Sequence, residues 1–384
     1  MTEPVHDLAW APGRIEVGCA GATEAGEARQ FLEAQLAGHP LQAQLRFDLT
    51  ATSTGAGSVL SCRLPAVVAS DLAPGHNTLA LSTHLASPMA DHTTALRQEI
   101  LLAMLLGPMA IHHPELAELT SALAIRSNIA QLAATTRMAF ETRRAVRPSE
   151  FWRHDEEWGF LLKPGASLIE AMYRATQPGD GAAPFSFSCY RANEYVMLLG
   201  IAQEMAVCIP GLYAALQSLW RQRTISSGRF HDVFLQEVGS HAEPLPMHWY
   251  IPGDRVWFRN PDEASADASG YEGSWVFYLG GGRFSNFWKR DQAYDLAGKC
   301  LEVYHWRHGT YQDAAGELRM DEDRVADHVS RSLADPAEAA RIVARMSRYR
   351  DPRGVYAEGG CIDSTREWAR WVGPRHGSVV LPPV

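Results

Sequence analysis

The first part of the chain alternates apolar and polar positions with a period of two. Between Arg14 and about Leu85, the segments RIEVGCA, LQAQLRFDLTAT, SVLSCRLPAVVA and NTLALSTHL are separated by Gly, Pro and Asn, with one helical patch, EAGEARQFLEAQLAG. Alternation places successive side chains on opposite faces of a strand. The pattern therefore predicts a β-rich N-terminal module over residues 1–90.

From Thr93 onward the apolar positions recur at helical spacing. One helix is predicted from Thr93 to Leu106, and a second begins near Pro114, where proline suits the first helical turn. Further along, FSFSCYRANEYVMLLGIAQEM carries apolar side chains on more than one helical face. This segment predicts a central, well-buried helix.

Cys189 lies where this buried helix is expected to begin. If Ser186 or Ser188 caps the helix, the thiol falls in the first turn, where free N–H groups and the helix dipole stabilise an anion. Such a position lowers a thiol pKa toward that of a useful nucleophile. The other interpretation is that Cys189 only fills space in the core, as buried cysteines often do.

The last third of the chain reads mainly as strands. The expected strands are MHWYI, RVWFRN, SWVFYL, RFSNFWKR and KCLEVYHWRHG, with turns at PGD and GGG. Polar helical segments, EDRVADHVSRSL and PAEAARIVARM, follow. We predict one α+β domain over residues 93–350 and a Gly-rich C-terminal tail over residues 351–384.

Composition narrows the function classes. The chain has 384 residues, 46% of them hydrophobic, and a formal charge of −9 without any long basic run, which argues against a nucleic-acid partner. No secretory signal or membrane span is expected, so a cytoplasmic location fits best. The six cysteines lack metal-type spacing and predict neither a zinc site nor a disulfide scaffold. Only Lys163, Lys289 and Lys299 are lysines.

Five segments, read in this order and spacing, resemble one known family. They are LAELTSALAIRSNIAQLA, PSEFWRH, FSCYRA, PGDRVWFRNPD and GYEGSWVFYLGGGRF, and together they cover roughly residues 114–287. This combination resembles the spore-coat type of bacterial transglutaminase, a protein-glutamine gamma-glutamyltransferase. The resemblance implies a papain/NlpC-P60-like core, in which the nucleophile helix packs on an antiparallel sheet.

The resemblance also implies a reaction. Cys189 would attack the side-chain amide of a protein glutamine, release ammonia and hold the acyl group as a thioester. A lysine amine of a second protein would then form an isopeptide bond. The implied partners are protein substrates, and neither a metal nor an organic cofactor is implied. Few lysines in the chain would limit cross-linking of the enzyme to itself, although codon bias explains the same count.

The sequence departs from the family pattern at three positions. Ser188 and Ser274 stand where the family has acids, and Phe287 stands where it has a histidine. A thiol without a general base loses about 10²- to 10⁴-fold in proton transfer. Glu272, two residues before Ser274 and so on the same strand face, could replace the acid. His305 is a further candidate for the base, as is His248.

Other residues of the matching segments are expected to contact substrate: Ser188, Tyr190, Trp257, Asn260, Ser274, Trp275 and Asn286. A one-residue slip at the glycine turn would bring Asn286 to the histidine position. Three functions stay open. The first is a transglutaminase-like acyltransferase, the second a non-catalytic relative that binds a protein partner through the same cleft, and the third a cysteine deamidase or peptidase with water as acceptor.

Overall fold

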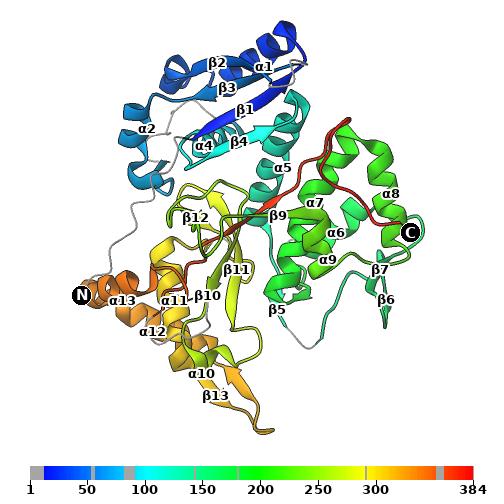
Figure 1. Cartoon of the computed structure of the whole chain (residues 1–384). Coiled ribbons are helices and arrows are strands. Elements are labelled where there is room, and N and C mark those ends of the chain that lie inside the picture. Colours follow the sequence, from blue (N-terminus) through cyan, green and yellow to red (C-terminus); the bar gives the residue numbers. More distant parts are fainter. Residues whose placement is uncertain are drawn as a thin grey trace.

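The structure, a computed structural model, describes residues 13–52, 57–81, 91–141, 144–179, 181–289, 292–351 and 359–383. Figure 1 shows a sheet with its helices at the top, a second sheet in the centre, and helical layers on either side of that central sheet. Within the described residues, the two larger sheets have four and five strands, and three further sheets have two strands each. Helices and strands are thus mixed without a regular βαβ alternation, as the predicted α+β class requires.

The four-stranded sheet contains strands from both sides of the predicted domain boundary. Its order is β2-β3-β1-β4, and its elements in the chain are β1 (Arg14–Cys19), α1 (Ala22–Gln35), β2 (Arg46–Ala51), β3 (Ser58–Arg63), α2 (Ala66–Leu72), α4 (His92–Leu105) and β4 (Ala110–His113). β4 runs parallel to β1, with Ile111 beside Ile15. The module predicted for residues 1–90 therefore shares its sheet with a strand that comes later, and the boundary itself stays a prediction.

The five-stranded sheet is antiparallel and has the order β12-β11-β10-β15-β9. Its strands are β9 (Leu235–Val238), β10 (Arg255–Arg259), β11 (Gly273–Gly280), β12 (Arg283–Phe284) and β15 (Arg366–Ala369). β15 belongs to the segment interpreted as a tail, yet it lies between β10 and β9. In Figure 1 it crosses the middle of the molecule.

Two helical layers cover the two faces of this central sheet. α7 (Cys189–Cys208) packs between α5 (Leu116–Thr135) and β11. Along β11, Phe277 joins the apolar cluster of α5 and α7, whereas Val276 and Tyr278 join the cluster of α11 (Leu296–Gly309). This period-two division is that of a strand buried on both faces. The predicted core, a helix that starts at the candidate nucleophile and packs on an antiparallel sheet, is confirmed.

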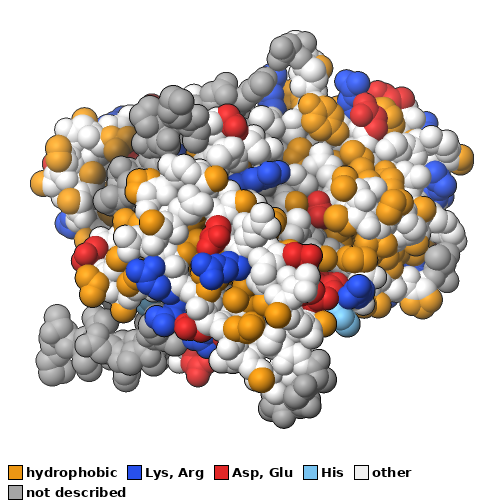
Figure 2. Space-filling model, turned by 90° about the horizontal axis from the view of Figure 1, so that it is seen from above, with side chains coloured by type: hydrophobic (Ala, Val, Ile, Leu, Met, Phe, Trp, Pro, Cys, Tyr) orange, Lys and Arg blue, Asp and Glu red, His pale blue; other side chains and the backbone are white. Residues whose placement is uncertain are grey.

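The remaining elements surround this core. They are β5 (Ala139–Phe140), β6 (Trp152–Asp155), β7 (Gly159–Leu162), α6 (Leu168–Thr176), β8 (Ser186–Phe187), α8 (Pro210–Trp220), α9 (Gly228–Phe234), α10 (Glu263–Ala266), β13 (Thr310–Gln312), β14 (Leu318–Met320), α12 (Glu322–Ala334) and α13 (Pro336–Met346). Among the described helices, none is both long and apolar enough to cross a membrane. On the face shown in Figure 2, lysines and arginines lie among acidic and hydrophobic side chains.

Two strands predicted in the last third of the chain are wrong, and a third, RFSNFWKR, is a strand only at Arg283–Phe284 among its described residues. The segment KCLEVYHWRHG belongs to helix α11, whose first turn is capped by the Asp295 side chain accepting from the Gly298 backbone at 2.6 Å. Leu301, Val303 and His305 are buried and alternate, which imitates a strand, but Cys300 and Trp306 are buried as well and give the helical spacing. The segment MHWYI lies in a turn and adjoining coil rather than in a strand.

A buried ion pair joins α5 to the turn before β10. Arg126 donates to the Asp254 carboxylate at 2.6 Å, and both side chains are less than a tenth exposed. The other carboxylate oxygen of Asp254 accepts from the Ile251 backbone. Gly253 has φ +89°, and a Cβ there would come within 2.9 Å of the Arg126 backbone. The PGD motif is therefore the place where helix and sheet meet without room for a side chain.

Asp254→Asn tests this ion pair. Because the substitution leaves the Arg126 charge buried without its partner, we expect the free energy of unfolding to fall by about 3 kcal/mol. Urea denaturation followed by circular dichroism measures the change. Glu170→Gln, which breaks the exposed pair with Arg174, serves as the control and should have little effect. Equal stability of the two variants would contradict the role given to Asp254.

Candidate active site

Cys189 is the first residue of α7. Ser188 is the N-cap, and its hydroxyl accepts a hydrogen bond from the Arg191 backbone at 3.4 Å. The predicted cap at the start of this helix is thus confirmed, and Ser188 is one of the two serines considered for it. The Cys189 side chain is partly exposed, unlike those of Cys19, Cys62, Cys300 and Cys361, which are buried.

The pKa of the Cys189 thiol is raised, not lowered as its place at the helix start led us to expect. Burial is the largest cause, and the negative charge of Glu272 adds a small contribution. A hydrogen bond from the Trp275 backbone and the positive charges of Lys299 and Arg255 act in the opposite direction. Desolvation of the thiolate therefore outweighs the helix terminus and the nearby cations.

Cys189 opens into a cavity walled by several regions of the chain, which we call the Cys189 cavity. Ser274 and Tyr271 come from the start of β11 and the loop before it, and Asn286 and Lys289 from the loop after β12. The helices α11 and α12 complete the wall. The polar residues that line the cavity are Cys189, Tyr271, Ser274, Asn286, Lys289, Tyr294, Lys299, Glu302 and Glu322.

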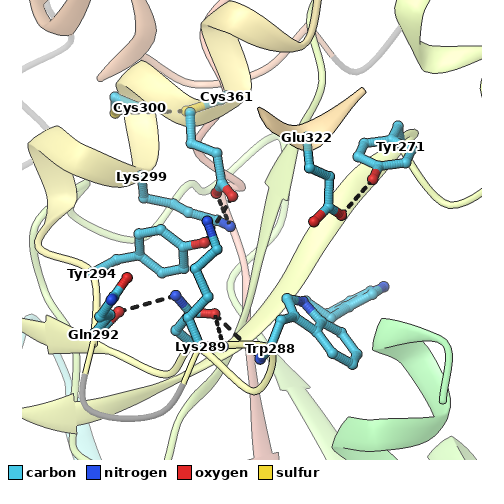
Figure 3. Close-up of polar contacts among 12 residues, drawn as sticks. Tyr271, Trp288, Lys289, Gln292, Tyr294, Lys299, Cys300, Glu322 and Cys361 are labelled. Carbon is cyan, nitrogen blue, oxygen red and sulfur yellow. Dashed lines mark hydrogen bonds and ion pairs between the residues drawn. The ribbon is translucent and has the colours of Figure 1, made fainter. Parts of the chain in front are cut away.

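One wall of the cavity carries a hydrogen-bonded ion pair. The Lys299 ammonium lies 2.5 Å from a carboxylate oxygen of Glu302, and the Tyr294 hydroxyl donates to the other oxygen of Glu302 at 2.7 Å. Lys299 also lies over the Tyr294 ring, 4.3 Å from its centroid. Its side chain is only 3% exposed, so Glu302 supplies the neutralising charge that a buried ammonium needs. Figure 3 shows Lys299 extended toward Tyr294.

A second acid faces the cavity from α12. The Tyr271 hydroxyl donates to the Glu322 carboxylate at 2.7 Å, as Figure 3 shows. Burial, followed by the charge of Glu322, raises the pKa of Tyr271. The phenol therefore stays neutral and acts as a donor. The cavity thus contains two carboxylates, each held by a tyrosine, in addition to the thiol.

Ser274 and Asn286 are the predicted substrate contacts that line the cavity. Ser274 occupies the position where the resemblance expects an acid, and its side chain is nearly buried. Asn286 is already engaged in the protein: its amide donates to the Gln292 backbone, and its oxygen accepts from the backbones of Trp288 and Lys289. Asn286 therefore holds the loop after β12 in place. Within the described part of the chain, only the second N–H of its amide is left for a hydrogen bond to a substrate.

Tyr190, Trp257 and Trp275 form an aromatic group at the sheet. Trp257 and Trp275 are stacked with ring centroids 5.5 Å apart, and Tyr190 meets Trp275 edge-on. The buried Arg255 lies over both Tyr190 and Trp275 and forms an ion pair with Glu367 of β15. Among the described residues that line the Cys189 cavity, none belongs to this group.

Asn260 has a local structural role. Its side chain is fully buried, donates to the Ser265 hydroxyl and the Tyr271 carbonyl, and accepts from the Asp262 backbone. These bonds close the loop that precedes β11. Asn260 therefore positions Tyr271 at the cavity, while a direct contact with substrate stays a prediction.

The candidate bases lie apart from the lining of the cavity. Glu272 is exposed and comes just before β11 begins, and its backbone carbonyl accepts from Asn260. His305 is buried in α11, where its two ring nitrogens contact Ser332 and His308. Burial, then His308, His328 and Arg307, lowers its pKa to about 4. Neither residue lines the cavity in the described part of the chain.

Phe287 and His248 are the other two positions that the sequence analysis considered for a histidine base. Phe287, at the family's histidine position, is buried against Phe277 in the core cluster of α5 and α7. His248 is partly buried, and its backbone carbonyl accepts from Thr78 in the N-terminal part of the chain. The side chain that would serve as a histidine base in the resemblance is therefore apolar core here.

Sequence reasoning missed most of the acid and base groups of the cavity. Lys299, Glu302 and Glu322 are more than 100 residues from Cys189 and belong to helices, one of which was expected to be a strand. The one available signal was the lysine count, because two of the three lysines, Lys289 and Lys299, line this cavity. The scarcity of lysine therefore does not keep amines away from Cys189.

Comparison with known proteins identifies the family of this chain. Residues 78–365 match the family model described as protein-glutamine gamma-glutamyltransferase. Because this span covers most of the chain, the protein belongs to that transglutaminase family. A solved transglutaminase from Geobacillus stearothermophilus, without its C-terminal extension, superposes with TM-score 0.36 and 19% identity over 56% of this chain and 98% of its own. No curated protein matches the sequence.

Alkylation of the cysteines tests the local environment of Cys189. In the folded protein we expect iodoacetamide to label only Cys189 and the exposed Cys208, and to label both slowly at pH 7, since burial raises the pKa of each, that of Cys208 to about 11. Only the thiolate reacts, so the rates should keep rising above pH 9. Peptide mass mapping against pH measures both rates.

Lys299→Met should slow the labelling of Cys189 at a given pH, because it removes a positive charge that lowers the pKa of this thiol. Lys163→Met is the matched control, since Lys163 bonds to the Ser149 backbone and is not among the cavity residues. Faster labelling of Cys189 in Lys299→Met than in the control would show that the ammonium does not stabilise the thiolate.

Proposed function

We propose that this protein is a cysteine acyltransferase that acts on glutamine side chains of proteins. The observation that carries the proposal is the position of Cys189, at the start of a capped helix and in a cavity with Lys299, Glu302, Tyr271 and Glu322. A nucleophilic thiol is activated by a neighbouring base or by a group that lowers its pKa, and the cavity offers carboxylates for the first role and a cation for the second. Membership of the transglutaminase family supports the same reaction class.

The reaction has two halves. The Cys189 sulfur bonds to the glutamine amide carbon, the carbon–nitrogen bond breaks, and ammonia leaves with the proton given up by the thiol. A lysine amine of a second protein then attacks the thioester, the carbon–sulfur bond breaks, and the amine proton restores the thiol. With water in place of the amine, the product is glutamate.

The proton acceptor in this proposal is a carboxylate of the cavity, Glu302 or Glu322. Both line the same cavity as Cys189, whereas Glu272 and His305 do not. A candidate base must come within hydrogen-bond reach of the proton it removes, either directly or through one water. Glu302 is bound to Lys299 and Tyr294, so a proton received there would be exchanged within a hydrogen-bonded group.

Lys299 acts as the electrostatic partner of the thiolate. Its charge lowers the pKa of Cys189 against the larger effect of burial. Its amine is held in a close ion pair with Glu302, which keeps it from taking the place of the acceptor lysine. Lys289, which is exposed at the cavity, lacks an ion pair among those found in the described residues and is the internal amine most able to react with a thioester.

Amine incorporation tests the function. The protein is incubated with a glutamine-containing donor protein and a fluorescent primary amine, and labelled donor is measured on gels. We expect incorporation that disappears in Cys189→Ala and rises with pH between 7 and 9, because the raised pKa of the thiol leaves little thiolate at neutral pH.

Substitution of the acids locates the base. Glu302→Gln or Glu322→Gln should lower turnover by about 10²-fold or more, while the exposed Glu272→Gln should leave it nearly unchanged. Thermal unfolding of each variant checks the fold. A large loss of turnover in Glu272→Gln, with normal turnover in the other two variants, would show that Glu272 is the base, as the strand geometry first predicted.

The two alternative functions, a non-catalytic relative and a deamidase, predict different results in the same assays. A non-catalytic relative is favoured by the buried Phe287 at the histidine position and by the raised pKa of Cys189. It predicts no incorporation at any pH, together with binding of a protein partner that survives in Cys189→Ala. Release of ammonia without incorporation of the amine, dependent on Cys189, would instead identify a deamidase.

A further inference from the structure

Three histidines from two helices come together beside the Cys189 cavity. His305 and His308 lie on α11, and His328 lies on α12. One ring nitrogen from each can be chosen so that all three lie within 4.8 Å of one another. The centroids of the His308 and His328 rings are 4.6 Å apart, and those of His305 and His328 are 5.5 Å apart.

Two of the three ligand nitrogens already have nearly the spacing of a metal site. The Nδ1 atoms of His305 and His308 are 3.0 Å apart. In a tetrahedral zinc site with Zn–N bonds of about 2.0–2.1 Å, two ligand nitrogens are separated by about 3.3 Å. A shift of a few tenths of an ångström would therefore let both imidazoles bind one ion.

A second contact orients His305 as a ligand. Its Nε2 atom lies 2.8 Å from the hydroxyl of Ser332, which is buried on α12. Histidines that bind metals usually donate their other ring N–H to a fixed acceptor, and this fixes the tautomer and the ring plane. With the Nε2 proton given to Ser332, the lone pair of Nδ1 points toward His308.

We propose that His305, His308 and His328 bind one divalent transition-metal ion, with zinc as the preferred ion and water at the fourth position. Imidazole nitrogens suit zinc, whereas calcium and magnesium require oxygen ligands. The charges that act on His308 from its surroundings are those of Arg307, Arg324 and Asp262. Asp262 favours a cation at this position, and the two arginines disfavour it.

The ion would hold together the two helices that form one wall of the Cys189 cavity. α11 contributes Lys299 and Glu302 to that wall, and α12 contributes Glu322. None of the three histidines is among the described residues that line the cavity. The role assigned to the ion is therefore to fix the positions of these helices, and it takes no part in acyl transfer.

This proposed site differs from what the sequence led us to expect. The cysteine spacing argued against zinc, and the resemblance implied no metal. The pair His305 and His308 has the i, i+3 spacing that shares a helix face, but that face exists only if the segment is helical, and the sequence was read as a strand. His328 is brought to the pair by the packing of α12 on α11.

Metal titration tests the proposal without use of any enzyme activity. The full-length chain, freed of purification tag and treated with chelator, is titrated with Zn²⁺ by calorimetry and with Co²⁺ by visible absorption. We expect one equivalent to bind and the intense d–d bands of tetrahedral Co²⁺ to appear. His308→Ala and His328→Ala, whose side chains are partly exposed, should each bind at least tenfold more weakly and lose those bands.

His92→Ala, an exposed histidine on α4, is the matched control and should bind as the native chain does. Zn²⁺ should also raise the Tm of the native chain and of this control, but not that of the other two variants, because a ligand that binds only the folded state stabilises it. Failure to bind either ion, or binding that is unchanged in His308→Ala and His328→Ala, would overturn the proposal.

Discussion

The ion pair between Arg126 and Asp254 is the contact on which the rest of the core depends. It joins the central helix α5 to the turn that starts β10, at a point where Gly253 lets the two backbones touch. The Arg126 guanidinium also lies over the Trp368 ring of β15, 4.8 Å from its centroid. Arg126 thereby fixes the relative positions of helix α5, the turn before β10 and strand β15. Because α7 packs on α5, this contact also sets where Cys189 stands relative to the sheet.

The local features of the site could be read from the sequence because their signals are short-range. The Ser188 cap, the buried helix after it and the glycine turn after β11 each depend on a few adjacent residues whose backbone preferences are strong. The α+β class followed from the mixture of such segments. The expected helix start drew attention to Cys189, and the family resemblance then implied that it is the nucleophile, which periodicity could not have done, since a buried cysteine and a nucleophile occupy the same kind of position.

The sequence did not predict which side chains line the cavity, because this depends on contacts between distant segments. Lys299 and Glu302 belong to a helix in which alternating Leu301, Val303 and His305 imitated a strand. Glu322 reaches the site only through the packing of α12 on α11. Likewise β15 was interpreted as part of a tail, because its four residues are too few to show a period against their glycine-rich surroundings.

The cavity implies a different distribution of charge from the one the family resemblance led us to expect. Where a histidine was expected, Phe287 completes the apolar core next to Phe277, so no titratable group can act from that strand position. The charged groups of the cavity instead include Lys299 with Glu302 and Glu322 with its tyrosine partner Tyr271. Burial disfavours the Cys189 thiolate, and only Lys299, Arg255 and the Trp275 backbone oppose it. Lys299 is one of the groups that lower the pKa of this thiol, so the packing of α11, which positions Lys299, affects how readily the thiol ionises.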